Sequence, residues 1–250
     1  MTSKLPKGVM NKSYSCDRKV KNHLVYRYKS RAFEAAKSFQ KYSVSSSNPN
    51  ILDFGSADGF ALTETHRLLN ANLSLGVEYS EDLILSSDPL PPSCSIIQGD
   101  VTKSLDQVKS GNFDLVTALA ILEHLEEPIE LFYRAHDALK AEGLIVATCP
   151  FPFWDKISGK FKLHEDEFHA FDFNRDAFLS LAAKSGFEAL EYRKFMSAPV
   201  GFAPYLKIPM SPRFSQLFDR IISTFFIFNW TFVNQIFVAQ KNHSYQLPNS

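Results

Sequence analysis

The chain has 250 residues, is 45% hydrophobic and carries a formal net charge of zero. This length suits one domain with appended segments, and the apolar content is enough to bury a core, which excludes an intrinsically disordered protein. The three cysteines are far apart and have no C-x-x-C spacing. They therefore predict neither a disulfide framework nor a zinc site, and they favour a reducing, cytoplasmic compartment.

The first 42 residues are strongly basic. They hold eleven Lys or Arg against two acidic residues, a net charge of +9, so the remainder of the chain carries −9. A basic segment can contact phosphates, nucleic acid or an anionic membrane, or it can be a solvated helix face. An amphipathic helix is predicted here by apolar residues at helical spacing: Val20, Leu24, Tyr28, Ala32, Ala35, Ala36 and Phe39. We assign residues 1–47 to a basic arm and helix, and expect no signal peptide because no apolar run follows the first basic residues.

Short apolar runs alternate with helical patterns from residue 48 to residue 150. Strands are expected at 51–55, 73–78, 94–100, 113–120 and 143–150. Helices are expected at about 58–70 and 127–140, with a short one between the second and third strands. Strands separated by helices in this way predict a mostly parallel sheet with right-handed crossovers.

The later part of the chain is less regular. A helix is expected near 174–185, with Gly186 at its C-terminal cap, followed by a strand at 187–195 and a last strand at 230–239. We assign 48–240 to one domain.

Two segments of this domain, 151–173 and 196–229, join aromatic residues with prolines. We interpret them as loop and cap insertions that line an apolar entrance, and residues 241–250 as a tail.

Residues 221–240 contain no charged residue, and about 20 apolar residues can span a bilayer. Polar side chains interrupt the run at Ser223, Thr224, Asn229, Thr231, Asn234 and Gln235. Each of them is costly in lipid, so we predict instead a helix end followed by a buried strand.

The stretch "ILDFGSADGF", residues 51–60, reads as a strand, a tight turn and the start of a helix. Gly55 and Gly59 allow the backbone to turn and to approach a ligand closely. The dinucleotide fingerprint G-x-G-x-x-G is absent, because Ala57 and Phe60 occupy the positions of its second and third glycines. The turn also lacks the lysine of a P-loop, and its two carboxylates suit a ligand that carries a positive charge.

The pattern D-x-G-x-A-x-G resembles the first motif of class I S-adenosylmethionine-dependent methyltransferases, in which the middle position is usually glycine. "LGVEYS", "IIQGDV", "FDLVTALAILEHLEEP" and "ALKAEGLIVATCP" are similar to later motifs of the family, in the same order, over residues 48–195. The resemblance implies a Rossmann-like α/β fold. Its seven-stranded, mostly parallel sheet has an antiparallel last strand and helices on both faces. It also implies S-adenosylmethionine as the cofactor, in an enzyme similar to the small-molecule, ubiquinone-methyltransferase-like branch.

The family pattern further implies which residues hold the cofactor. Glu78 matches the acidic residue that bonds both ribose hydroxyls, and Asp100 the carboxylate that accepts from the adenine amino group. The full set of expected cofactor contacts is Asp53, Gly55, Ser56, Ala57, Gly59, Glu78, Tyr79, Asp100, Val101 and Ala118.

Two histidines are candidate catalytic residues, because an oxygen or nitrogen acceptor often needs a base. His124 follows the fourth expected strand, and His169 lies in the loop after the fifth. A structural role is the alternative for each. In the ubiquinone-type branch an E-x-x-E-H pattern is associated with a metal, but Ala120 replaces its first glutamate here, so we predict no metal site.

Residues 151–240 contain 17 of the 23 phenylalanines. Many of them must pack in the core, but the irregular segments among them favour a small or lipid-like acceptor, methylated at oxygen. The basic arm favours peripheral membrane contact, and we expect no nucleic acid partner. Two alternatives stay open: an RNA methyltransferase that uses the arm, and a non-catalytic binding protein that kept the fold.

Overall fold

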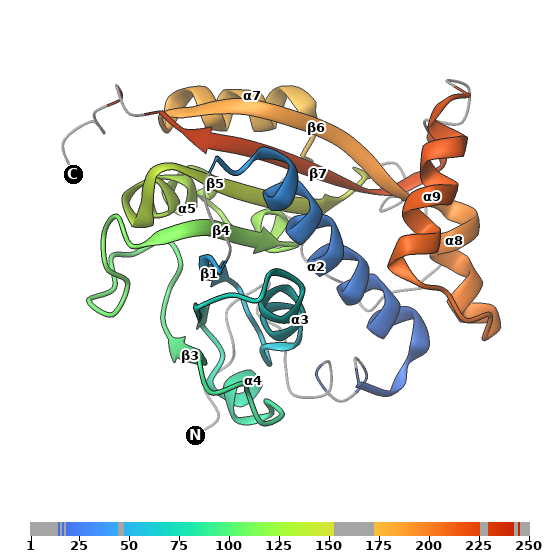
Figure 1. Cartoon of the computed structure of the whole chain (residues 1–250), viewed down its shortest axis with the longest axis horizontal. Coiled ribbons are helices and arrows are strands. Elements are labelled where there is room, and N and C mark those ends of the chain that lie inside the picture. Colours follow the sequence, from blue (N-terminus) through green and yellow to red (C-terminus); the bar gives the residue numbers. More distant parts are fainter. Residues whose placement is uncertain are drawn as a thin grey trace.

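The computed structural model describes residues 15, 17, 19–44, 48–152, 173–225, 230–242 and 245. A seven-stranded sheet of order β3-β2-β1-β4-β5-β7-β6 forms its centre (Figure 1). The strands are β1 (Asn50–Phe54), β2 (Leu73–Glu78), β3 (Cys94–Gln98), β4 (Phe113–Leu119), β5 (Leu139–Pro150), β6 (Phe187–Ser197) and β7 (Phe232–Lys241). The strand β7 runs antiparallel to both β5 and β6, and the other six strands share one direction, so the predicted Rossmann-like fold is confirmed.

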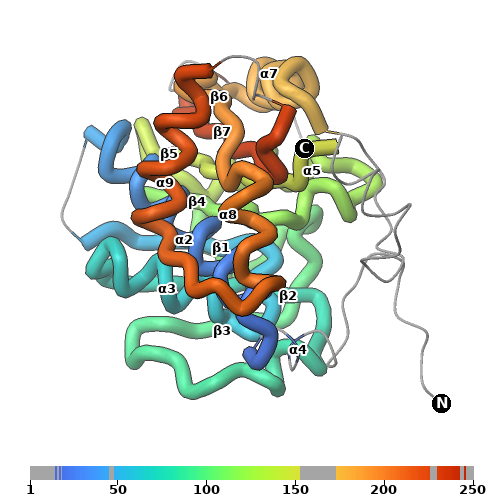
Figure 2. Tube along the Cα trace, turned by 90° about the vertical axis from the view of Figure 1, so that its right-hand side faces the viewer, coloured from blue at the N-terminus to red at the C-terminus, as the bar shows by residue number. Residues whose placement is uncertain are grey.

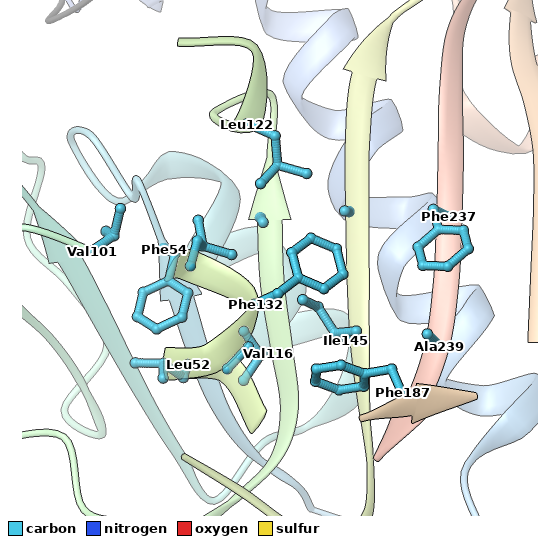
Figure 3. Packing of buried hydrophobic residues seen from close by; sticks show 14 of the residues in the cluster. Leu52, Phe54, Val101, Val116, Leu122, Phe132, Ile145, Phe187, Phe237 and Ala239 are labelled. Carbon is cyan, nitrogen blue, oxygen red and sulfur yellow. The ribbon is translucent and has the colours of Figure 1, made fainter. Parts of the chain in front are cut away.

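Side-chain alternation along the central strands builds two apolar layers. Leu52 and Phe54 of β1 pack in one cluster, together with Val116 of β4, whereas Ile51 and Leu115 pack in the cluster on the other face. Figure 3 shows the first of these clusters, with Phe132 lying over the strands. Both faces of these strands are buried because helices cover both, as is usual for parallel sheets.

The helices divide between the two faces. Residues of α2 and α3 pack in one apolar cluster, and residues of α5 and α7 pack in the other. The bounds are α2 (Asn22–Tyr42), α3 (Phe60–Leu69), α4 (Glu81–Leu85), η1 (Leu122–His124), α5 (Pro128–Ala138) and α7 (Arg175–Lys184).

Two details differ from the sequence-based expectation. Val20 lies before the start of α2 and is 76% exposed, because the buried stripe of this helix begins later, at Tyr26. The helix α5 ends at Ala138 rather than at residue 140, since Leu139 already pairs with Phe113 of β4.

A cap of helices connects β6 to β7. It consists of α8 (Ala198–Phe202), η2 (Ala203–Leu206) and α9 (Pro212–Ser223), which Figure 2 shows facing the viewer. Ser197 at the end of β6 pairs with Phe232 at the start of β7. As predicted, a helix end and then a buried strand follow residue 221, and no described helix has the length and apolar character that a membrane span requires.

The strand order reverses between β1 and β4, from which successive strands extend in opposite directions. In open α/β sheets the crevice at the carboxyl ends of such strands is where ligands bind. The loops after β1, β2, β3 and β4 meet at this edge, which we call the carboxyl edge of the sheet. It carries nearly all of the described residues that the sequence analysis assigned to the cofactor.

Candidate active site

The loop between β1 and α3 has the backbone shape that the motif predicts. Gly55, Ala57 and Gly59 all have positive φ, at 76°, 51° and 75°. A Cβ on Gly55 would lie 2.5 Å from Cδ1 of Ile121. A larger residue therefore fits at this position only if the side chain of Ile121 or the loop backbone moves. The left-handed conformation is unfavourable for Ala57, which stands where the family usually has glycine.

Glu78 fixes this loop to the end of β2. Its Oε2 accepts from the backbone N–H of Ala57 at 2.8 Å, and its Oε1 accepts from that of Ser80 at 2.9 Å. The carboxylate is only 7% exposed. Each carboxylate oxygen can accept more than one hydrogen bond, so these two contacts leave capacity for the hydroxyls of a ribose.

Asp100 and Val101 lie just after β3. Oδ1 of Asp100 accepts from both the N–H and the hydroxyl of Thr102, at 3.0 and 2.6 Å, while Oδ2 lies 3.5 Å from the ammonium of Lys103. Partial burial opposes ionisation, but the Thr102 and Lys103 contacts outweigh it and hold the pKa of Asp100 below its ordinary value. The carboxylate therefore stays ionised as an acceptor beside the buried side chain of Val101.

The remaining predicted contacts differ in their exposure. Tyr79 is 47% exposed, and its side chain is free to cover a ligand. Asp53 is buried and accepts from the hydroxyl of Thr117 at 2.6 Å, which ties β1 to β4. Ala118 is fully buried in the central cluster, so its side chain has no exposed surface for a ligand in this conformation.

Unsatisfied polar atoms mark the same loops. The hydroxyls of Ser56, after β1, and of Ser80, after β2, are buried and have no hydrogen-bond partner among the described residues. Both atoms have almost no accessible surface, and Oγ of Ser56 faces Gly76 of β2, so neither hydroxyl can reach a ligand in this conformation. The carboxylates of Glu78 and Asp100 are the groups that suit the ribose and adenine of a nucleoside cofactor.

The basic arm contributes contacts that sequence reasoning missed. The hydroxyl of Ser15 donates at 2.8 Å to Oδ2 of Asp58, a residue of the loop between β1 and α3 that we call the cofactor loop. The same hydroxyl accepts from the hydroxyl of Ser86 at 2.9 Å. Lys19 donates to Asp88 at 2.7 Å. No local sequence pattern predicts these pairs, because the two residues of each pair lie 43 to 71 positions apart in the chain.

His124 ends the short helix η1 and is partly exposed at the carboxyl edge. Its neighbour Glu123 is buried, and Oε2 of this carboxylate has no hydrogen-bond partner among the described residues. The pKa of the Cys149 thiol is raised well above its ordinary value, mainly because the thiol is fully buried and also because the Glu123 carboxylate lies nearby. This thiol therefore stays protonated. The other candidate, His169, lies outside the described residues.

Two charged residues of α2, Arg31 and Glu34, are buried against β6 and β7, which was not predicted from the sequence. Arg193 of β6 forms an ion pair with Glu34, and Arg31 donates to Oδ1 of Asn234 at 3.3 Å. Burial raises the pKa of Glu34 although Arg193 opposes the shift. Beside these residues a cavity of about 700 Å³ opens between α2, β6 and α9. Within the described ranges, no group of three or more potential ligands could hold a metal ion.

Comparison with known proteins identifies the class. Residues 26–192 match the model of the methyltransferase domain family, which covers more than half of the chain. The chain therefore belongs to this family and is an enzyme. The class I fold, the enzyme class and S-adenosylmethionine as cofactor, all predicted from the sequence, are confirmed. A search of curated protein sequences gave no match.

Solved structures share the fold at low sequence identity. A SAM-dependent methyltransferase from Archaeoglobus fulgidus is 17% identical over 92% of this chain and 99% of its own, with a TM-score of 0.62. An S-adenosylmethionine-dependent methyltransferase from Mesorhizobium loti is 15% identical over 84% and 98%, at 0.59. The [4+2]-cyclase SpnF is 15% identical over 84% and 81%, at 0.57. At such identities the likeness shows the fold alone, and the cyclase shows that the fold also serves another reaction.

Proposed function

We propose that this methyltransferase methylates an oxygen of a small, lipid-like acceptor, and that it is similar in chemistry to the ubiquinone-methyltransferase-like branch. The observation that carries the proposal is the position of the cap. Because β6 runs parallel to β1 and ends at the carboxyl edge, the cap between Ala198 and Ser223 starts at the same edge as the cofactor loop. Exposed apolar side chains of the cap, among them Leu206 and Phe214, support an acceptor entrance on this side of the enzyme.

The cofactor supplies a methyl group on a positively charged sulfur. Glu78 and Asp100 are proposed to hold its ribose and adenine, and the loop of Gly55 and Gly59 to pass close beneath it. The protein's main contribution is then to hold the acceptor oxygen in line with the methyl carbon and the sulfur, since orientation alone can lower such a barrier by ~7–11 kcal/mol.

His124 is the proposed base. It lies after β4, next to the switch point, where its imidazole can take the proton of an acceptor hydroxyl. The matched alternative, a purely structural histidine at the start of this loop, predicts loss of stability rather than loss of turnover.

The acceptor class can be tested with methyl-labelled S-adenosylmethionine and paired phenols that share a ring but differ in alkyl chain length. We expect the labelled methyl group to appear in the methyl ether of the phenol, and we expect a higher kcat/KM for the phenol with the longer alkyl chain. Preference for the short-chain phenol, or label in an amine or in RNA only, would contradict the acceptor class. Cofactor binding with no transfer to any acceptor would favour the non-catalytic alternative.

The role of His124 has its own test. His124→Gln should lower kcat toward the phenol by roughly 10²–10⁴-fold and leave the affinity for the cofactor unchanged. His66→Gln, at the amino edge beside Ser74, is the control and should leave kcat unchanged. A larger loss of stability in His124→Gln than in His66→Gln, with turnover retained by His124→Gln, would assign a structural role to His124.

A further inference from the structure

The helix α9 leaves part of its apolar side uncovered. Its buried residues are Ser215 and Asp219, and Phe218 packs against the core beside them, whereas Phe214, Leu217 and Ile221 are 51%, 58% and 54% exposed. A surface helix normally turns its apolar stripe toward the core and its polar residues toward water. Phe214, Leu217 and Ile221 therefore form an exposed apolar stripe that is suited to contact with an apolar phase outside this chain.

The inward polar side of α9 is well anchored. Oδ2 and Oδ1 of Asp219 accept from the backbone N–H groups of Met196 and Ser197, at 2.6 and 2.9 Å. Gln216, Asp219 and Arg220 also line the cavity between α9 and α2. The orientation of α9 is thus fixed by buried hydrogen bonds, and the apolar stripe cannot simply roll inward.

Exposed apolar side chains are concentrated in this cap. Nine of the 14 large apolar residues that are exposed in the described parts of the chain lie between residues 202 and 230. We call this set the apolar cap surface: Phe202, Tyr205, Leu206, Ile208, Phe214, Leu217, Ile221, Phe225 and Trp230. Figure 2 shows α8 and α9, which carry several of these residues, on one side of the molecule. A concentration of exposed apolar side chains of this kind indicates an interaction site.

The charges around the apolar cap surface are positive. Lys207, Arg213 and Arg220 are exposed, and the only acidic residue between positions 198 and 230 is Asp219, which is buried. The start of α2 adds Arg27, which donates to the hydroxyl of Tyr205 at 3.2 Å. Apolar and aromatic side chains surrounded by Lys and Arg are the composition of helices that lie in the interface of an anionic membrane.

We propose that the apolar cap surface docks on an anionic lipid bilayer, with α9 lying in the plane of the interface. A second copy of the chain is a weaker occupant, because a two-fold interface would bring the same cations of each copy together. The proposal deepens the proposed function and rests on it in one respect. Docking at the carboxyl edge would present the active site to acceptors held in the membrane.

The test is flotation of the full chain with vesicles of phosphatidylcholine, with and without phosphatidylglycerol. The wild-type chain should bind the mixed vesicles and bind pure phosphatidylcholine at least about tenfold more weakly. Leu217→Asp should reduce binding to the mixed vesicles by about tenfold or more. Leu68→Asp is the matched control, because Leu68 is 40% exposed near the end of α3, at the amino edge of the sheet, and should bind like the wild type.

A second variant removes charge and keeps the apolar stripe. Lys207→Glu combined with Arg213→Glu should weaken binding to mixed vesicles by roughly tenfold or more and leave the sedimentation coefficient unchanged. Wild-type binding to neither vesicle, or equal binding by Leu217→Asp and Leu68→Asp, would overturn the proposal. A wild-type dimer that Leu217→Asp converts to a monomer would assign the surface to a second copy instead.

The docking proposal and the acceptor proposal fail separately. Vesicle binding is measured without acceptor or cofactor, and phenol methylation is measured without vesicles. Methylation of long-chain phenols by a chain that ignores vesicles would reject docking alone. Vesicle binding by a chain that methylates none of the phenols would reject the acceptor class alone.

Discussion

The two halves of the carboxyl edge are built in different ways. In the half formed by the ends of β1, β2 and β3, Glu78 joins neighbouring loops by accepting from the N–H groups of Ala57 and Ser80, and the arm adds the contact of Ser15 with Asp58. In the half toward β7 and β6, pairs much farther apart in the chain join α2 to the strands. Glu34 meets Arg193 and Arg31 meets Asn234, 159 and 203 residues away in the chain.

This difference matches the two tasks of the enzyme. One cofactor is common to the class, so a short loop with defined backbone angles suffices to bind it. Acceptors vary among enzymes of one fold, and insertions commonly form the surfaces that meet them, which is the role we propose for the α8–α9 cap. The comparison predicts that substitutions in the first half act on cofactor binding, and that those between the halves act on stability.

The largest effect is expected at Gly55, where the cofactor loop touches the start of η1. Gly55→Ala should lower the free energy of unfolding by roughly 2–5 kcal/mol, because a positive φ and a contact of its Cβ with Ile121 are both unfavourable. Gly111→Ala is the matched control, since Gly111 also has a positive φ but nothing lies within 4 Å of its Cβ. Urea unfolding measures both, and equal losses would show that close packing at Gly55 contributes nothing.

The next effect is expected at Glu78 and isolates the cofactor half. Glu78→Ala should weaken the binding of S-adenosylmethionine by about 1.5–3 kcal/mol, because hydrogen bonds to a charged group are lost. Glu81→Ala removes an exposed carboxylate three residues later and should change the affinity by less than ~0.5 kcal/mol. Calorimetric titration compares the two, and unchanged affinity in Glu78→Ala would remove this residue from the ribose site.

The smallest effect is expected at the bond that joins the halves. Thr117→Val removes the hydroxyl that donates to Asp53, and should lower the free energy of unfolding by about 1–2 kcal/mol. Thr148→Val is the control, because the buried hydroxyl of Thr148 has no partner among the described residues, and this change should be neutral or stabilising. A larger loss at Thr148 than at Thr117 in urea unfolding would reverse the assignment.

Sequence reasoning succeeded where structure is local. Alternating apolar runs placed the strands within a few residues, and Gly55, Glu78 and Asp100 lie at successive strand ends as expected. It could not predict the contact of Ser15 with Asp58, because that contact depends on how a distant arm folds over the sheet. Only the end of α9 was predicted, and its start at Pro212 was not, because the prolines around it suggested an irregular cap, although Phe214, Leu217 and Ile221 have helical spacing.

The most direct test of the central claim is calorimetric titration of the wild-type chain with S-adenosylmethionine and, separately, with NAD. We expect saturable binding of S-adenosylmethionine in the micromolar range and no binding of NAD. Absence of S-adenosylmethionine binding by a folded chain, or binding of NAD in its place, would contradict the assignment of the loop from Asp53 to Gly59 to this cofactor.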